Sequence, residues 1–195
     1  VIHNVFMSTG YAEFCLLVYD DMPLIQDMLN LSMDRNRRII EILCQYPVSF
    51  VRVVDHVVHE GGPMIRPDML ETLWVPRTRE MVSPARDNDV ILEWHGCGRI
   101  DKVLPYVVEM GFNAIDPIQP QCNDIYALHK QYGKNLAFIG NIDLDLLATA
   151  TPEQVEADVA EHIGRLAVDG GYIVKTGNSP TGPIVPRNLV AMADA

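Results

Sequence analysis

The chain has 195 residues, 48% of them hydrophobic, so it is long enough to bury the core of one domain. Its formal net charge of -11 argues against nucleic-acid binding, because a polyanion requires a basic stripe. Charged residues, Pro or Gly interrupt the apolar stretches well before the ~20 residues that a membrane helix needs. We therefore expect a single domain over residues 1–195 that binds neither nucleic acid nor membrane.

The cysteines are sparse and show no CxxC pairing, which does not fit a disulfide framework. The sequence shows no secretory signal and no lipidation motif. Both features favour a reducing compartment, and we expect a cytoplasmic protein.

Apolar β-type runs alternate along the chain with longer helical patterns, which is typical of βα units and a parallel sheet. The predicted strands cover residues 50–55, 90–98, 114–118, 136–140 and 172–174. The predicted helices cover residues 22–45, 67–85, 99–110 and 123–132, with two more starting at Thr151 and near Pro186, and a loop is expected at 61–63. A spacing of roughly 30 residues per unit is that of a TIM-type (β/α)8 barrel. The fold class is therefore α/β, with about five consecutive βα units of such a barrel.

The predicted strand at 90–98 ends in a histidine and a cysteine two residues apart. Alternate side chains of a strand share a face, so Glu93, His95 and Cys97 would point the same way. Imidazole and thiolate are the ligands that zinc prefers in proteins. The pattern therefore indicates a metal site, although a buried cysteine beside a hydrogen-bonded histidine would give the same pattern.

Polar residues also follow the other predicted strands. In a barrel, residues at the carboxyl ends of the strands carry out the chemistry. The residues at these ends are Asp55 with His56, His95 with Cys97, Asp116, Asn141 with Asp143, and Asn178. The chain has no GxGxxG or GxxxxGK[ST] motif, so a nucleotide-binding doubly wound sheet is not indicated.

Several segments together resemble the uroporphyrinogen decarboxylase superfamily. They are, in chain order, residues 62–67, Trp94-His95-Gly96-Cys97-Gly98, 109–115, Gly140-Asn141-Ile142-Asp143, 151–155, 170–173 and 186–192. The resemblance implies a TIM-like barrel that is longer than this chain, with these residues forming its C-terminal portion. Decarboxylase members bind substrate with arginines of an N-terminal motif and centre the reaction on an early aspartate, and neither lies in this sequence.

A second branch of the superfamily contains corrinoid-dependent methyltransferases, and its HxC motif is similar to His95 and Cys97. In that branch the histidine and cysteine bind zinc together with a later cysteine. This chain has Asn178 where that cysteine is expected, and an amide oxygen is a poorer zinc ligand than a thiolate. Glu93, Asp55 and Cys122 are the alternatives for the third ligand.

The resemblance implies Asp55, His95 and Asn178 as catalytic positions. Asp55 would orient a substrate or a ligand, or be a solvated loop carboxylate. The expected enzyme carries out zinc-assisted methyl transfer involving a corrinoid, either as a methylcobalamin:thiol methyltransferase or as an O-demethylase component. The corrinoid would be carried by a partner protein, and the substrate would be a small molecule. The alternatives are a uroporphyrinogen decarboxylase of porphyrin biosynthesis and a non-catalytic barrel fragment that folds by association. Two open sheet edges would also permit a homodimer.

Overall fold

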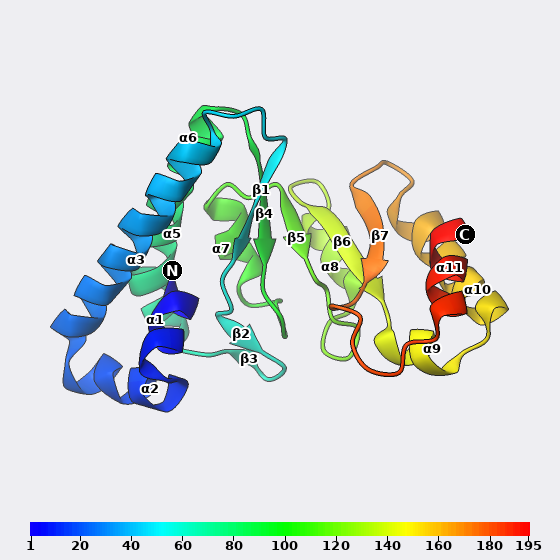
Figure 1. The fold of residues 1–195 in the computed structure, drawn as a ribbon, viewed down its shortest axis with the longest axis horizontal. Helices are drawn as coiled ribbons and strands as arrows, with labels where there is room; N and C mark the ends of the chain where they lie inside the picture. The colour runs from blue at the N-terminus through cyan, green and yellow to red at the C-terminus, as the bar shows by residue number, and fades with distance from the viewer.

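The computed structural model describes residues 1–195 and contains a five-stranded parallel sheet (Figure 1). The strands lie side by side in the order in which they occur in the chain. They are β1 (Phe50–Val54), β4 (Ile91–His95), β5 (Ala114–Asp116), β6 (Ala137–Ile142) and β7 (Tyr172–Thr176). This arrangement confirms the α/β prediction and is that of a partial TIM-type barrel.

Helices precede the first strand and follow the others, and they cover one face of the sheet (Figure 1). The helices before β4 are α1 (Ile2–Thr9), α2 (Tyr11–Asp20), α3 (Met22–Leu43), α4 (Pro67–Met69), the π-helix η1 (Leu70–Trp74), α5 (Val75–Met81) and α6 (Ser83–Asp87). The later helices are α7 (Leu104–Glu109), α8 (Ile125–Tyr132), α9 (Leu144–Thr149), α10 (Pro152–Leu166) and α11 (Pro186–Asp194). None of them is both long and apolar enough to cross a bilayer.

The two faces of the sheet differ in burial. Side chains that face the helices, such as Leu92 and Trp94, have almost no exposed surface. On the opposite face, Phe50, Ile91 and Ile173 remain 52–54% exposed. We call this second face the inner face, because it corresponds to the interior of a closed barrel. It also carries His95, since strand residues alternate between the two faces.

Helix starts follow the capping residues of the sequence. Thr151 accepts a hydrogen bond from the backbone of Gln154, whose side chain accepts one from the Thr151 backbone, so α10 begins with a capping box. The Asp143 side chain accepts a hydrogen bond from the backbone N–H of Asp145 and caps α9.

The structure differs from the predicted elements in several places. The strand predicted at 90–98 ends at His95, so Cys97 lies in the loop beyond it. Two helices, α1 and α2, precede the expected first helix, and they are separated at Gly10, whose φ of 89° favours glycine. The expected loop at 61–63 belongs to a hairpin of β2 (Val58–His59) and β3 (Gly62–Pro63). The helix expected from residue 99 begins at Leu104, because Pro105 occupies its first turn and residues 101–103 form a turn.

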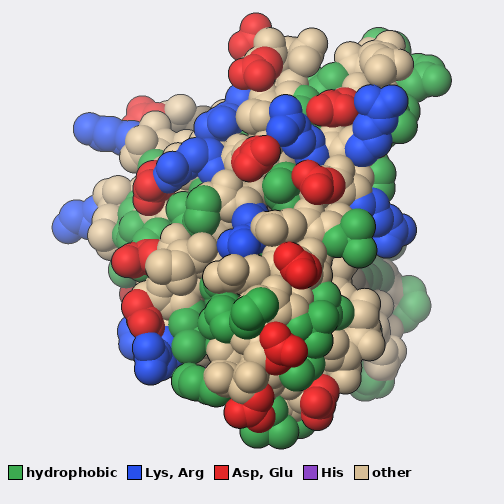
Figure 2. All heavy atoms as spheres, turned by 90° about the vertical axis from the view of Figure 1, so that its left-hand side faces the viewer, with side chains coloured by type: hydrophobic (Ala, Val, Ile, Leu, Met, Phe, Trp, Pro, Cys, Tyr) green, Lys and Arg blue, Asp and Glu red, His purple; other side chains and the backbone are tan.

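The surface around α3 mixes charges of both signs (Figure 2). Arg37 pairs with Glu41 and with Glu80, and Arg38 also pairs with Glu41. Exposed pairs of this kind contribute little to stability. This side of the molecule is therefore a solvated face on which positive and negative side chains are mixed.

Candidate metal centre

Three side chains of the kinds that bind metals meet at the carboxyl ends of β1 and β4. His56, His95 and Cys97 each offer one ligand atom, and these atoms all lie within 4.8 Å of one another. Parallel pairing of the two strands brings them together, because Val54 is in register with His95 and the Asp55 N–H donates to the His95 carbonyl.

The spacing of this group suits zinc. The Cys97 Sγ lies 3.5 Å from the His95 Nε2, and the His56 and His95 rings are 5.6 Å apart between centroids. Zinc bonds of ~2.0–2.3 Å in a tetrahedron separate two ligand atoms by roughly 3.3–3.8 Å. Histidine and cysteine are both zinc ligands, and three protein ligands leave a fourth position for a substrate. The distance between His95 and Cys97 fits a shared zinc ion, and His56 lies close enough to supply a third ligand.

Asp116, at the end of β5, fixes the orientation of His95. Its Oδ2 lies 2.7 Å from the His95 Nδ1, which leaves Nε2 directed at Cys97. Its Oδ1 accepts a hydrogen bond from the Lys175 ammonium of β7, and its side chain is fully buried. A carboxylate on the second ring nitrogen fixes the tautomer of a metal-binding histidine and raises its basicity. The inner face therefore supplies both a ligand and its support.

The same contacts shift the pKa values of the two residues. Burial alone would lower the pKa of His95, but the hydrogen bonds with Asp116 and Cys97 raise it to about 9. Burial alone would raise the pKa of the Cys97 thiol, but hydrogen bonds with His56 and His95 lower it to about 6. Without metal, Cys97 is therefore a thiolate at neutral pH, which is the form that binds metals.

The pKa of Cys97 predicts how its alkylation depends on pH. The thiolate is the reactive form, so the rate in metal-free protein should rise as pH increases through about 6. Cys122 provides an internal control, because burial raises the pKa of its thiol. Iodoacetamide labelling followed by mass spectrometry measures both sites. Reaction of Cys97 only near the ordinary thiol pKa of about 8.5 would contradict the expectation.

The predicted residue Asn178 also lies at the group. Its Nδ2 donates to the Cys97 Sγ over 3.6 Å, and its Oδ1 accepts from the Ser179 N–H over 2.8 Å. The Asn178 Oδ1 also lies 3.9 Å from the Cys97 Sγ, so both ends of the amide group are near the sulfur. In this arrangement it is a hydrogen-bond partner of a candidate ligand.

The other predicted ligands lie outside this group. Glu93 shares the face of His95, as strand parity predicts, but its carboxylate pairs with Arg52 at 2.6 Å. The Cys122 thiol contacts the Gln119 carbonyl instead. The structure thus places neither Glu93 nor Cys122 among the three clustered donors.

Asp55 is buried, so the interpretation as a solvated loop carboxylate is wrong. It accepts hydrogen bonds from the Trp74 indole at 2.9 Å and from the backbone nitrogens of Val1 and His3 at 2.7 and 2.8 Å. These contacts connect the end of β1 to α1 and η1. Asp55 also lies outside the three-residue donor group.

The sequence pattern places His56 at the end of the first predicted strand but does not identify it as a ligand. Like His95, it is a histidine at the carboxyl end of a strand. Recognising it requires knowing that β1 is the direct neighbour of β4, which the sequence spacing does not show.

Gly98 allows the Cys97 loop to pack closely against the β2–β3 hairpin. Its φ is 129°, and a Cβ atom there would lie 2.6 Å from the His59 carbonyl carbon. Backbone atoms cannot move away as a flexible side chain can. Glycine is therefore required at position 98 both for the backbone conformation and for the close packing of the Cys97 loop against the β2–β3 hairpin.

Replacement of Gly98 by alanine should lower the free energy of unfolding by about 1–3 kcal/mol, because it combines strain with a clash. Gly164→Ala is the matched control, since Gly164 is exposed on α10 with open space at its Cβ position. Gly164→Ala should raise the free energy of unfolding by up to about 1 kcal/mol. Urea unfolding compares the two, and equal stabilities would contradict the role of Gly98.

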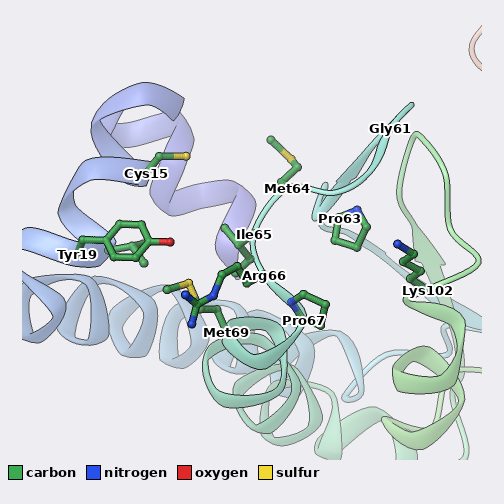
Figure 3. A pocket seen from close by; sticks show the side chains of 11 residues that line it. Cys15, Tyr19, Gly61, Pro63, Met64, Ile65, Arg66, Pro67, Met69 and Lys102 are labelled. Atoms are coloured by element: carbon green, nitrogen blue, oxygen red, sulfur yellow. The ribbon is translucent and has the colours of Figure 1, made fainter.

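The largest cavity does not contain the candidate ligands. It has a volume of about 480 Å³ and lies between α2, the β2–β3 hairpin and the segment that follows it (Figure 3). Cys15 and Tyr19 line it from α2, and Lys102 lines it from the opposite side. A second cavity, of about 360 Å³, is lined by Asn178 but by none of the three clustered donors.

The family model of uroporphyrinogen decarboxylase (URO-D) matches residues 4–195, which is nearly the whole chain. The chain belongs to the URO-D family. A uroporphyrinogen decarboxylase from Vesicomyosocius okutanii is 31% identical over 71 residues, which are 36% of this chain and 20% of that protein.

A methyltransferase from Methanosarcina mazei shares the fold of this URO-D family chain. The TM-score is 0.73 at 15% identity, and the match covers 95% of this chain and 52% of the methyltransferase. The chain therefore spans about half the length of that structure and a fifth of the curated relative.

Proposed function

We propose that this URO-D family chain takes part in zinc-assisted methyl transfer from a corrinoid to a small-molecule thiol. The cluster of His56, His95 and Cys97 is the observation that supports this proposal. Zinc held there would bind the acceptor thiol as its thiolate, a nucleophile at neutral pH. The fold shared with a methyltransferase is compatible with this chemistry.

The protein side chains have distinct tasks in this proposal. Asp116 holds His95 with Nε2 toward the metal position, and Lys175 keeps the Asp116 carboxylate charged. Asn178 donates to the Cys97 sulfur from the cavity side. A methyl-corrinoid would supply the methyl group. The acceptor sulfur would form a bond to the methyl carbon as the carbon–cobalt bond breaks, the electron pair would stay on the corrinoid, and the thiol proton would pass to solvent.

The test is methylation of a thiol by methylcobalamin, followed by the visible absorbance of the corrinoid. Zinc-loaded protein should accelerate the reaction, and removal of zinc with a chelator should abolish the acceleration until zinc is restored. His56→Ala should be as impaired as zinc-free protein. Equal rates with and without zinc would contradict the proposal.

Decarboxylation of uroporphyrinogen is the second candidate, favoured by the family match and by the V. okutanii relative. A substrate with several carboxylates requires free arginines. The three arginines closest to the strand ends are already paired, Arg52 with Glu93, Arg66 with Asp68 and Arg99 with Asp101. The substrate-binding arginines that the family resemblance implies lie outside this sequence, so these three pairs do not decide between the two reactions. The cluster of His56, His95 and Cys97 is the observation that favours methyl transfer. Release of CO₂ from uroporphyrinogen would reverse this choice.

A further inference from the structure

Glu93 is a buried carboxylate to which the proposed reaction assigns no task. It lies on β4 two residues before His95, and only 4% of its surface is exposed. Its one ion pair is with the Arg52 guanidinium, whose Nε lies 2.6 Å from the Glu93 Oε1. That oxygen accepts no aligned hydrogen bond, so the contact is an attraction between charges. A buried carboxylate is costly unless a cation balances it, and the burial of Glu93 therefore depends on Arg52.

Arg52 lies between two carboxylates of the inner face. It is directly opposite Glu93 on the neighbouring strand, and its Nη2 lies 3.8 Å from the Oδ2 of Asp116. The same Oδ2 lies 2.7 Å from the His95 Nδ1, while the Asp116 Oδ1 accepts from the Lys175 ammonium. Arg52 and His95 are therefore rival donors for one carboxylate oxygen.

The distances favour His95 over Arg52 as the donor. A separation of 3.8 Å is too long for a hydrogen bond between Arg52 and Asp116. A movement of about 1 Å would bring the guanidinium within hydrogen-bonding distance of the Oδ2. The Arg52 side chain is 41% exposed, which leaves it room to turn, and a guanidinium aligned with a carboxylate binds it strongly. The attraction of Glu93 opposes this movement.

We infer that Glu93 is a positioning residue of the metal centre, which holds Arg52 and thereby leaves the Asp116 Oδ2 to His95. The inference rests on the proposed function, because it concerns the support of His95 as a metal ligand. Glu93 acts on that ligand through two other side chains, without being one of the clustered donors. Without Glu93, Arg52 would pair with Asp116 and weaken the hydrogen bond that orients the imidazole.

The experiment replaces Glu93 by glutamine, which removes the charge that holds Arg52 and keeps the size of the side chain. Zinc affinity, measured by competition with a chromophoric chelator, should fall by about tenfold, the lower end of the usual effect of disturbing the partner of a metal-binding histidine. The second readout is the proton resonance of the His95 Nδ1–H in ¹⁵N-edited NMR, assigned by its loss in His95→Ala. It should move upfield as the hydrogen bond to Asp116 weakens, in zinc-free protein as well as in zinc-loaded protein.

Two variants separate the role of Arg52 from a general effect of charge. Glu93→Asp keeps the charge but shortens the side chain by one methylene, so it should shift the resonance in the same direction. It also supplies the comparison if Glu93→Gln does not fold. The double variant Arg52→Gln, Glu93→Gln lacks the guanidinium and should return both readouts to the wild-type values. Glu161→Gln, which breaks an exposed ion pair with Arg165 on α10, is the control and should change neither readout.

A His95 resonance that stays unchanged in folded Glu93→Gln would overturn the inference and leave the proposed function intact. A resonance that stays shifted in the double variant would do the same, because Arg52 would then not be the rival donor. A wild-type resonance in Glu93→Asp beside a shifted one in Glu93→Gln would assign the effect to charge alone and also overturn the inference. If the unmodified protein binds no zinc, the proposed function fails, and the resonance still shows whether Glu93 leaves Asp116 to His95.

Discussion

Replacement of Cys97 by alanine is expected to reduce bound zinc from about one ion per chain to nearly none. The thiolate is the only anionic ligand of the group, and its loss leaves two neutral imidazoles to hold a divalent cation. Metal analysis of protein equilibrated with equimolar zinc measures this change. His95→Ala should have a similar effect.

The control is Cys122→Ala, which removes a thiol outside the group, and it should retain zinc. Circular dichroism of each variant checks that the fold is intact. Stoichiometric zinc in folded Cys97→Ala protein would rule out the proposed centre. Loss of zinc in Cys122→Ala would instead make Cys122 the missing ligand.

Replacement of Asp116 by asparagine is expected to weaken zinc binding by about 10- to 100-fold, the usual effect of removing a carboxylate behind a metal-binding histidine. Asparagine keeps the shape, but it cannot balance the charge of Lys175 or select the His95 tautomer with Nε2 free. Competition with a chromophoric chelator measures the affinity.

Asp101→Asn is the control for this change, because Asp101 forms an exposed ion pair with Arg99. It should leave the zinc affinity unchanged. Unaltered affinity in Asp116→Asn would show that His95 needs no support from Asp116. The pKa of the Asp116 carboxyl agrees with a charged role, since burial would raise it but the hydrogen bonds from His95 and Lys175 lower it.

Much of the sheet could be predicted from the sequence, because buried parallel strands are apolar runs between helical patterns. Strand parity correctly placed Glu93 and His95 on one face. Contacts across strands could not be predicted in this way. His95 meets Asp116 because the two residues are in register on neighbouring strands, and Lys175 reaches Asp116 from a strand two places further along the sheet.

The N-terminal helices illustrate another limit. The segment before residue 21 is apolar on several sides, so its pattern does not separate helix from strand. Its position is set by tertiary contacts, since Val1 and Phe6 pack into the core and Asp55 binds the start of α1. Burial of the Asp55 carboxylate could not be foreseen for the same reason.

The exposed inner face affects the strength of the electrostatic contacts at the metal-binding group. Arg52 and Lys175 remain partly accessible to water, which weakens their attraction to Glu93 and Asp116. Any polypeptide that shielded Phe50, Ile91 and Ile173 from solvent would lower the local dielectric constant and strengthen both contacts. Hydrophobic association on this side of the sheet would thereby be thermodynamically linked to cation affinity at its edge.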